Sequence, residues 1–223
     1  MSLSIKIELL FSELIKWPGF SAIQNLIERD NVDLYLAGGA IRNIIIGNRE
    51  IKDFDFFVDS DNKEEVLGYL SKYGNVIYGP FGSPRWYPSN GTGIYCDLIW
   101  ISEFNNGLWR CKDITDVLNQ FDFTANAIAI DIKTAQVFNP ENGLRDIKDR
   151  IIRAVRFDYP NEPIAHRTPL TRLEVLWFRL LHYSNKYHME LEPITKNWVL
   201  ENSNFRVKEE EFKNLFFKPD IRL

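Results

Sequence analysis

Asp53 and Asp55, two residues apart, are the side chains in this sequence best suited to chemistry. They belong to DFDFFVD, a segment with the composition of a β-strand. Because side chains alternate between the two faces of a strand, both carboxylates emerge on one face while Phe54 and Phe56 point into the core. Adjacent carboxylates repel each other unless a cation neutralises them, and oxygen-only ligands favour Mg²⁺ or Mn²⁺. We therefore predict a metal site at Asp53 and Asp55.

A pair of glycines, Gly38 and Gly39, separates an apolar strand segment, DLYLA, from a predicted helix over residues 40–46. Glycine at this junction lets a phosphate approach the backbone, and the free N–H groups at a helix start attract anions. Arg42 is one turn into the helix and within reach of the same phosphates. Each motif alone is common on protein surfaces, but their combination predicts a catalytic site that holds a metal ion beside a phosphate group.

The segment from Leu36 to Asp59 resembles the signature of the DNA polymerase beta nucleotidyltransferase superfamily. More narrowly, it resembles the head domain of class II tRNA nucleotidyltransferases and poly(A) polymerases. The similarity continues in that family's order, with an FGT-like turn at 81–83, a DFTINA-like segment at 122–127 and a head-closing stretch at 139–155. The resemblance implies an α/β (α+β) fold. Its nucleotidyltransferase head, a mixed β-sheet flanked by helices, would span residues 1–157, and a small helical neck would span residues 158–223.

The same resemblance implies roles for individual residues. Asp53 and Asp55 would bind two Mg²⁺ ions and carry out the catalysis. The implied nucleotide-binding set is Gly38, Gly39, Arg42, Asp122 and Asn126. Asp97 is a charged residue in an apolar strand segment, which is costly unless the charge is paired or bound to a metal. It would be a third catalytic carboxylate, although a solvated strand face or a pair with an arginine would also explain it.

The positions that precede the DFT segment depart from the family's pattern. Gln120 and Phe121 stand where the family has two arginines that contact the substrate. Arg85 and Arg110 are candidate replacements, and ordinary surface roles for both remain open.

The neck departs further. In place of a base-reading Glu-Asp-x-x-Arg motif it has a segment that contains Thr168 and Thr171, which cannot reproduce that bidentate readout. The sequence ends at Leu223, whereas the family continues into body and tail domains that hold tRNA. We therefore expect a neck that is truncated relative to the family, with a partner chain or oligomer as a candidate source of the missing body.

The composition excludes several classes of protein. The 223 residues include 45% hydrophobic residues and two cysteines, Cys96 and Cys111, and they carry a net charge of −4. A disulfide framework and a zinc-finger spacing are excluded, and no segment has the roughly 18 apolar residues of a membrane span. The net charge by itself would contribute little to RNA affinity. We expect a cytoplasmic protein that does not bind membranes.

The carboxylate pair, the glycine pair and the family resemblance together predict a metal-dependent nucleotidyltransferase. It would transfer a nucleoside monophosphate from an NTP to an acceptor hydroxyl. The resemblance implies that the acceptor is an RNA 3′ end, as in CCA addition to tRNA or poly(A) synthesis. Two alternatives stay open, namely transfer to a small molecule or protein, and a nucleotide-binding remnant without turnover.

The elements that must position these residues follow from hydrophobic periodicity and turn residues. Before residue 157 we predict helices over 4–16, 21–28, 40–46, 62–72, 113–119 and 144–155. We predict strands over 33–37, 54–58, 76–78 and 94–101, turns over 79–93, and a hairpin of 127–132 with 136–138. Beyond a linker at 158–163 we predict three helices, 168–183, 193–201 and 207–217, and no strand.

Overall fold

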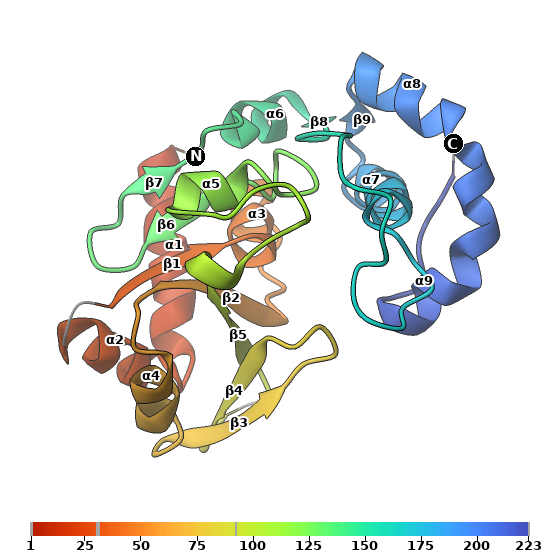
Figure 1. The fold of residues 1–223 in the computed structure, drawn as a ribbon. Coiled ribbons are helices and arrows are strands. Elements are labelled where there is room, and N and C mark those ends of the chain that lie inside the picture. The colour runs from red at the N-terminus through yellow and green to blue at the C-terminus, as the bar shows by residue number, and fades with distance from the viewer. Residues whose placement is uncertain (1, 30–31, 92, 223) are drawn as a thin grey trace.

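A seven-stranded mixed sheet forms the centre of the computed structural model, which describes residues 2–29, 32–91 and 93–222 (Figure 1). In chain order its strands are β1 (Asp33–Ala37), β2 (Asp53–Asp59), β3 (Gly74–Tyr78), β4 (Pro84–Pro88), β5 (Tyr95–Trp100), β6 (Ala129–Asp131) and β7 (Val137–Phe138). Their order across the sheet is β3-β4-β5-β2-β1-β6-β7. β2 and β5 are parallel and the other neighbours are antiparallel. The predicted fold class is confirmed.

Helices cover both faces of this sheet. They are α1 (Leu3–Lys16), α2 (Phe20–Arg29), α3 (Gly39–Ile46), α4 (Lys63–Leu70), α5 (Ile114–Leu118) and α6 (Gly143–Asp149). The main core packs Phe54 and Phe56 of β2 against Trp17, with ring centroids 5.0 and 6.4 Å apart. A second cluster packs Phe57 and α5 on the opposite face. Because side chains alternate along β2, Asp53 and Asp55 emerge on the face of Phe57.

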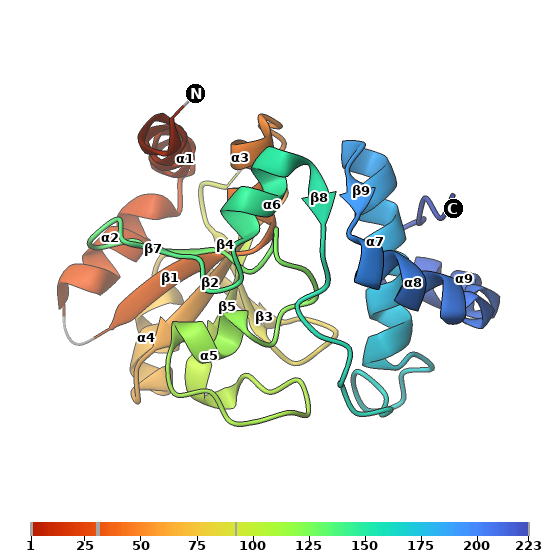
Figure 2. The same ribbon diagram turned by 90° about the horizontal axis from the view of Figure 1, so that it is seen from above.

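Three further helices lie to one side of the sheet (Figures 1 and 2). They are α7 (Arg172–Tyr187), α8 (Pro193–Glu201) and α9 (Glu209–Leu215), and a 3₁₀ helix spans Ser203–Lys208. A capping box formed by Thr171 and Glu174 begins α7. In the described part of the chain, every helix is too short or too polar to traverse a bilayer. The predicted boundary between a head and a neck at residues 157 and 158 stays a prediction.

Three predictions about elements are wrong. Residues 84–88, expected as turns, form β4, because Trp86 is fully buried and its indole donates to the Leu70 carbonyl at 2.9 Å. The helix expected to Val155 ends at Asp149, since Arg150 adopts a left-handed conformation with φ +56°. The next residues form β8 (Ile151–Ile152), which pairs in parallel with β9 (Glu190–Leu191) in a region expected to lack strands. A two-residue strand leaves almost no periodic signal in the sequence.

Candidate functional site

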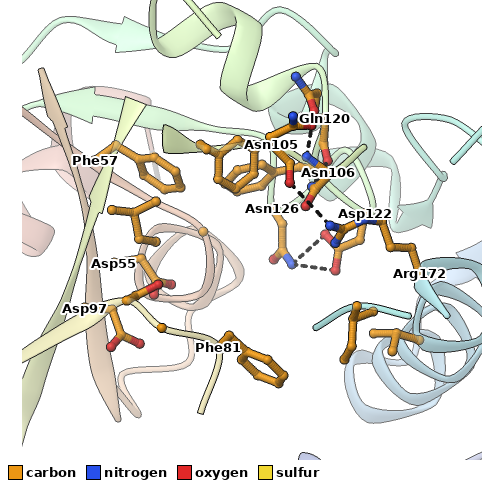
Figure 3. A pocket seen from close by; sticks show the side chains of 18 of the residues that line it. Asp55, Phe57, Phe81, Asp97, Asn105, Asn106, Gln120, Asp122, Asn126 and Arg172 are labelled. Carbon is orange, nitrogen blue, oxygen red and sulfur yellow. Dashed lines mark hydrogen bonds between the residues drawn. The ribbon is translucent and has the colours of Figure 1, made fainter. Parts of the chain in front are cut away.

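A cavity of about 560 Å³ lies between the sheet and α7 (Figure 3). Its sheet-side wall carries Gly38, Gly39, Asp55, Asp97, Asp122 and Asn126, and its α7 wall carries Arg172, Val175, Leu176 and Arg179. The cavity therefore joins most of the residues predicted from the sequence to side chains on a helix that begins about 50 residues further along. Such a concave space with a few convergent polar groups is the usual form of a small-molecule site.

Gly38 brings the backbone close to Asp55. Its φ of +78° and ψ of −134° belong to a region that is open almost only to glycine. A Cβ atom on Gly38 would lie 3.1 Å from Oδ2 of Asp55, whereas one on Gly39 would meet only the Arg42 Nη2 at an ordinary 3.5 Å. The first glycine is thus required by conformation and by space, and both glycines line the cavity at the start of α3, beside an acidic group.

The acidic residues gather where β2 and β5 run side by side. The register pairs Asp55 with Asp97 directly across the two strands. Burial, together with the charges of Asp53 and Asp97, raises the pKa of Asp55 from 3.8 to about 7, against the opposing charges of Arg179 and Arg42. Burial and the two neighbouring carboxylates thus outweigh the nearby arginines and disfavour the ionised form of Asp55. This donor set fits a divalent cation, which Asp53 and Asp55 would hold.

Other side chains already bind two of the three carboxylates. Arg85 donates from Nε to Asp97 Oδ1 at 2.8 Å, which is the arginine pair considered as an alternative for Asp97. Burial raises the pKa of Asp97, and the hydrogen bond and charge of Arg85 oppose that rise. The Tyr95 hydroxyl donates to Asp53 at 3.1 Å. Among residues 2–29, 32–91 and 93–222, no three Asp, Glu, His or Cys side chains are arranged as a ready metal-binding group. Asp97 would have to give up its contact with Arg85 to join such a group.

Asp122 and Asn126 form a hydrogen-bonded unit on the cavity wall (Figure 3). Asn126 donates to Asp122 Oδ1 at 3.1 Å, and Arg42 donates to the Asn126 side-chain oxygen. From the opposite wall, Arg179 Nε lies 2.8 Å from Asp122 Oδ2 as an ion pair. The two polar groups predicted to position the nucleotide are therefore fixed in orientation by an arginine on each side.

Arg42 occupies a different place from the one predicted. Its side chain is buried, and its guanidinium lies over the rings of Tyr183 and Tyr187 at 4.4 and 5.1 Å. Nη2 also donates to the Tyr187 hydroxyl at 3.1 Å and to the Asn43 side chain at 2.9 Å. These contacts join α3 to α7 behind the cavity. A direct contact between Arg42 and a phosphate stays a prediction, and in this structure the residue supports Asn126.

Gln120 and Phe121, at the positions that depart from the family's pattern, differ in their surroundings. Gln120 is fully buried and donates to the Trp109 carbonyl at 2.7 Å, so it holds a loop. Phe121 lines the cavity, and Arg110 is exposed. Sequence reasoning missed Arg172 and Arg179. Their spacing of seven places both on one face of α7, but without knowledge of what that face covers the spacing is uninformative.

The family profile described as "Gad2: Gabija anti-defense 2 family protein" matches residues 19–150. The chain belongs to the Gad2 family. The matched range contains the whole sheet and every cavity residue from Gly38 to Asn126. The α7 wall lies beyond the matched range.

Comparison with other known proteins relates this Gad2 chain to CCA-adding enzymes. It is 26% identical over 142 residues to the Multifunctional CCA protein of Haemophilus ducreyi, a match that covers 60% of this chain and 32% of that protein. A CCA-adding enzyme with CTP superposes with a TM-score of 0.68 at 19% identity, over 93% of this chain and 49% of that one. A tRNA nucleotidyltransferase with a primer tRNA and an incoming ATP analog gives 0.64 at 22% identity, over 85% and 53%.

These comparisons confirm the resemblance to the class II head domain and show that the chain has the fold of CCA-adding enzymes. The chain spans about a third of the curated relative and about half of the solved enzymes.

Proposed function

We propose that this chain is a metal-dependent nucleotidyltransferase that moves a nucleoside monophosphate from an NTP to an acceptor hydroxyl and releases pyrophosphate. The observation that carries this proposal is the close approach of Gly38 to Asp55 in a cavity that continues to Asp122 and Asn126. One space thus offers backbone N–H groups for phosphates, carboxylates for a cation, and fixed polar groups for a sugar or base.

Each group has a defined part in this mechanism. Gly38 and Gly39 hold the triphosphate against the first turn of α3. Asp53 and Asp55 would hold Mg²⁺, or Mn²⁺ in its place, and the bound ion would lower the pKa of an acceptor hydroxyl and neutralise the leaving pyrophosphate. A cation bound there would favour the ionised form of Asp55, whose pKa is raised to about 7 by burial and by the neighbouring carboxylates.

The orientation of the nucleotide would come from the second part of the cavity. Asp122 and Asn126 orient the sugar, since the ion pair to Arg179 and the hydrogen bond from Arg42 fix both groups before any ligand arrives. Groups fixed in advance lose little conformational entropy when the substrate binds.

The acceptor that we propose first is an RNA 3′ hydroxyl, because the solved relatives include an enzyme with a primer tRNA. The family description favours a second acceptor, a component of the Gabija defence system, since it names an action against that system. Thr168 and Thr171 in place of the base-reading motif also argue against ordinary CCA addition.

The test uses the whole chain, Mg²⁺ and each of the four NTPs labelled at the α-phosphate, with RNA in one arm and purified Gabija proteins in the other. Label on RNA supports the first acceptor, and label on protein supports the second. Label at the γ-phosphate should transfer to neither. If the α-label stays in free nucleotide in both arms, nucleotidyl transfer to these acceptors is refuted.

A second candidate function is nucleotide binding without turnover. The contacts of Arg85 with Asp97 and of Tyr95 with Asp53 favour it, because they occupy two of the three carboxylates. Under this alternative an NTP would bind equally well with Mg²⁺ and with EDTA, and no pyrophosphate would be released.

A further inference from the structure

The start of α7 faces the cavity from the side opposite the acidic residues, and the hydroxyl oxygens of the two threonines that precede it, Thr168 and Thr171, each accept a backbone N–H. Thr168 Oγ1 donates to the Ala165 carbonyl at 2.8 Å and accepts from the Ala165 N–H at 3.1 Å. Thr171 Oγ1 caps the helix by accepting from the Glu174 N–H. Both hydroxyls are therefore engaged by the backbone.

Arg172, the first residue of α7, is the polar side chain that this helix start directs into the cavity (Figure 3). Within the described ranges, the guanidinium makes one hydrogen bond, from Nη2 to the Asn105 carbonyl at 3.3 Å, and no ion pair. Arg179, in contrast, is paired with Asp122, whose charge raises the pKa of Arg179 against the effect of burial. For Arg172 burial is the larger effect, and its pKa is lowered. Arg172 thus has most of its donors free at the cavity wall.

An aromatic surface lies beside it. The rings of Phe57, Phe104 and Phe121 line the cavity and pack with centroids 5.5 to 6.2 Å apart. Phe104 directly precedes Asn105, whose carbonyl Arg172 contacts. Phe104 and Phe121 are only half-buried, so part of each ring is open to a ligand. Partly exposed aromatic rings next to a guanidinium form a typical surface on which a base stacks while its edge is read.

We propose that Arg172 reads the base edge of the incoming nucleotide and selects guanine or cytosine over adenine and uracil. This inference rests on the proposed function, because it assigns the substrate of the same cavity. A guanidinium offers only donors, in a planar fork. Guanine presents O6 and N7, and cytosine presents O2 and N3, as two adjacent acceptors. Adenine and uracil place a donor beside each acceptor on the corresponding edges, so the fork would meet an N–H group.

The test measures equilibrium binding of GTP, CTP, ATP and UTP to the full chain with Mg²⁺, by displacement of a fluorescent NTP. We expect GTP and CTP to bind about tenfold to a hundredfold more tightly than ATP and UTP, the discrimination of one bidentate contact. Arg172→Ala should remove this preference while ATP and UTP bind as before. Arg172→Lys, which keeps the charge but loses the fork, should remove most of the preference too. Arg145→Ala, at an exposed arginine of α6, is the matched control and should retain it.

Other results would overturn the inference. The first is that the unmodified protein binds ATP or UTP more tightly than GTP and CTP. The second is that the preference for GTP and CTP survives in Arg172→Ala. The third is an equal loss of affinity for all four NTPs in that variant, which would mean that Arg172 contacts a phosphate. In each of these cases NTPs still bind, so the proposed function would stand. Absence of binding for every NTP would instead refute the proposed function together with the inference.

Discussion

The pKa of Asp55 leads to a prediction about stability. The group titrates near 3.8 when unfolded and near 7 in the folded protein, so between these pH values the folded state binds the extra proton. Stability must therefore fall as the pH rises from about 4 to about 7 and then level off. The difference in pKa corresponds to about 4 kcal/mol at most, and we expect about 2 kcal/mol because solvent reaches the cavity wall. Asp55→Asn lacks this charge and should escape the loss.

Thermal unfolding of the full chain between pH 5 and pH 8.5 measures this effect. At pH 8 the Asp55→Asn variant should unfold about 5 °C above the unmodified protein, and at pH 5 the difference should shrink. Mg²⁺ should raise the unfolding temperature of the unmodified protein at pH 8 and leave the variant unchanged. Asp61→Asn, at an exposed residue beyond the end of β2, controls for the loss of a surface charge.

The same pH dependence in the two proteins would show that Asp55 does not destabilise the fold when it ionises. Lower stability of Asp55→Asn at pH 8 would also contradict the prediction, because the carboxylate would then be stabilised by contacts within the chain.

Three other perturbations test separate parts of the site. Gly38→Ala should lower the free energy of unfolding by about 1–3 kcal/mol and abolish NTP binding, while Gly39→Ala should keep the NTP affinity within about threefold. Calorimetric titration with NTP compares the two variants. Equal effects on affinity would argue against the close approach at Gly38. Arg85→Gln should tighten Mg²⁺ binding about fivefold, since it releases Asp97, and unchanged affinity would show that Asp97 does not contact the metal. Arg42→Ala should lower the free energy of unfolding, measured with denaturant, by about 3 kcal/mol. A decrease below about 0.5 kcal/mol would contradict the role of Arg42 in joining α3 to α7.

The sequence predicted the part of the site that depends on local pattern. Alternation in DFDFFVD placed Phe54 and Phe56 in the core and both aspartates on the other face, as the burial pattern of β2 confirms. Gly38 marked the strand-to-helix turn, and its positive φ gives the reason for a glycine there. Periodicity indicated a mixed α/β domain followed by a helical one, and the resemblance added the mixed sheet with flanking helices.

The rest depends on contacts between distant segments. Whether Asp97 pairs with an arginine follows from the register of β4 and β5, and β4 was hidden in a segment rich in turn residues. Arg42 is separated by more than 140 residues from Tyr187, so no local pattern could show that the two side chains meet. The contribution of α7 to the cavity, through Arg172 and Arg179, has the same origin.

The most direct test of nucleotidyl transfer is to follow pyrophosphate release and α-label incorporation together, in one reaction with Mg²⁺ and the acceptor. We predict equal amounts of both products for the unmodified chain and for Asp61→Asn, and neither product for Asp55→Asn. Pyrophosphate and incorporated label that persist undiminished in Asp55→Asn would contradict the assignment of this carboxylate. If the unmodified chain binds NTP but forms neither product, the proposal that it is a nucleotidyltransferase is contradicted.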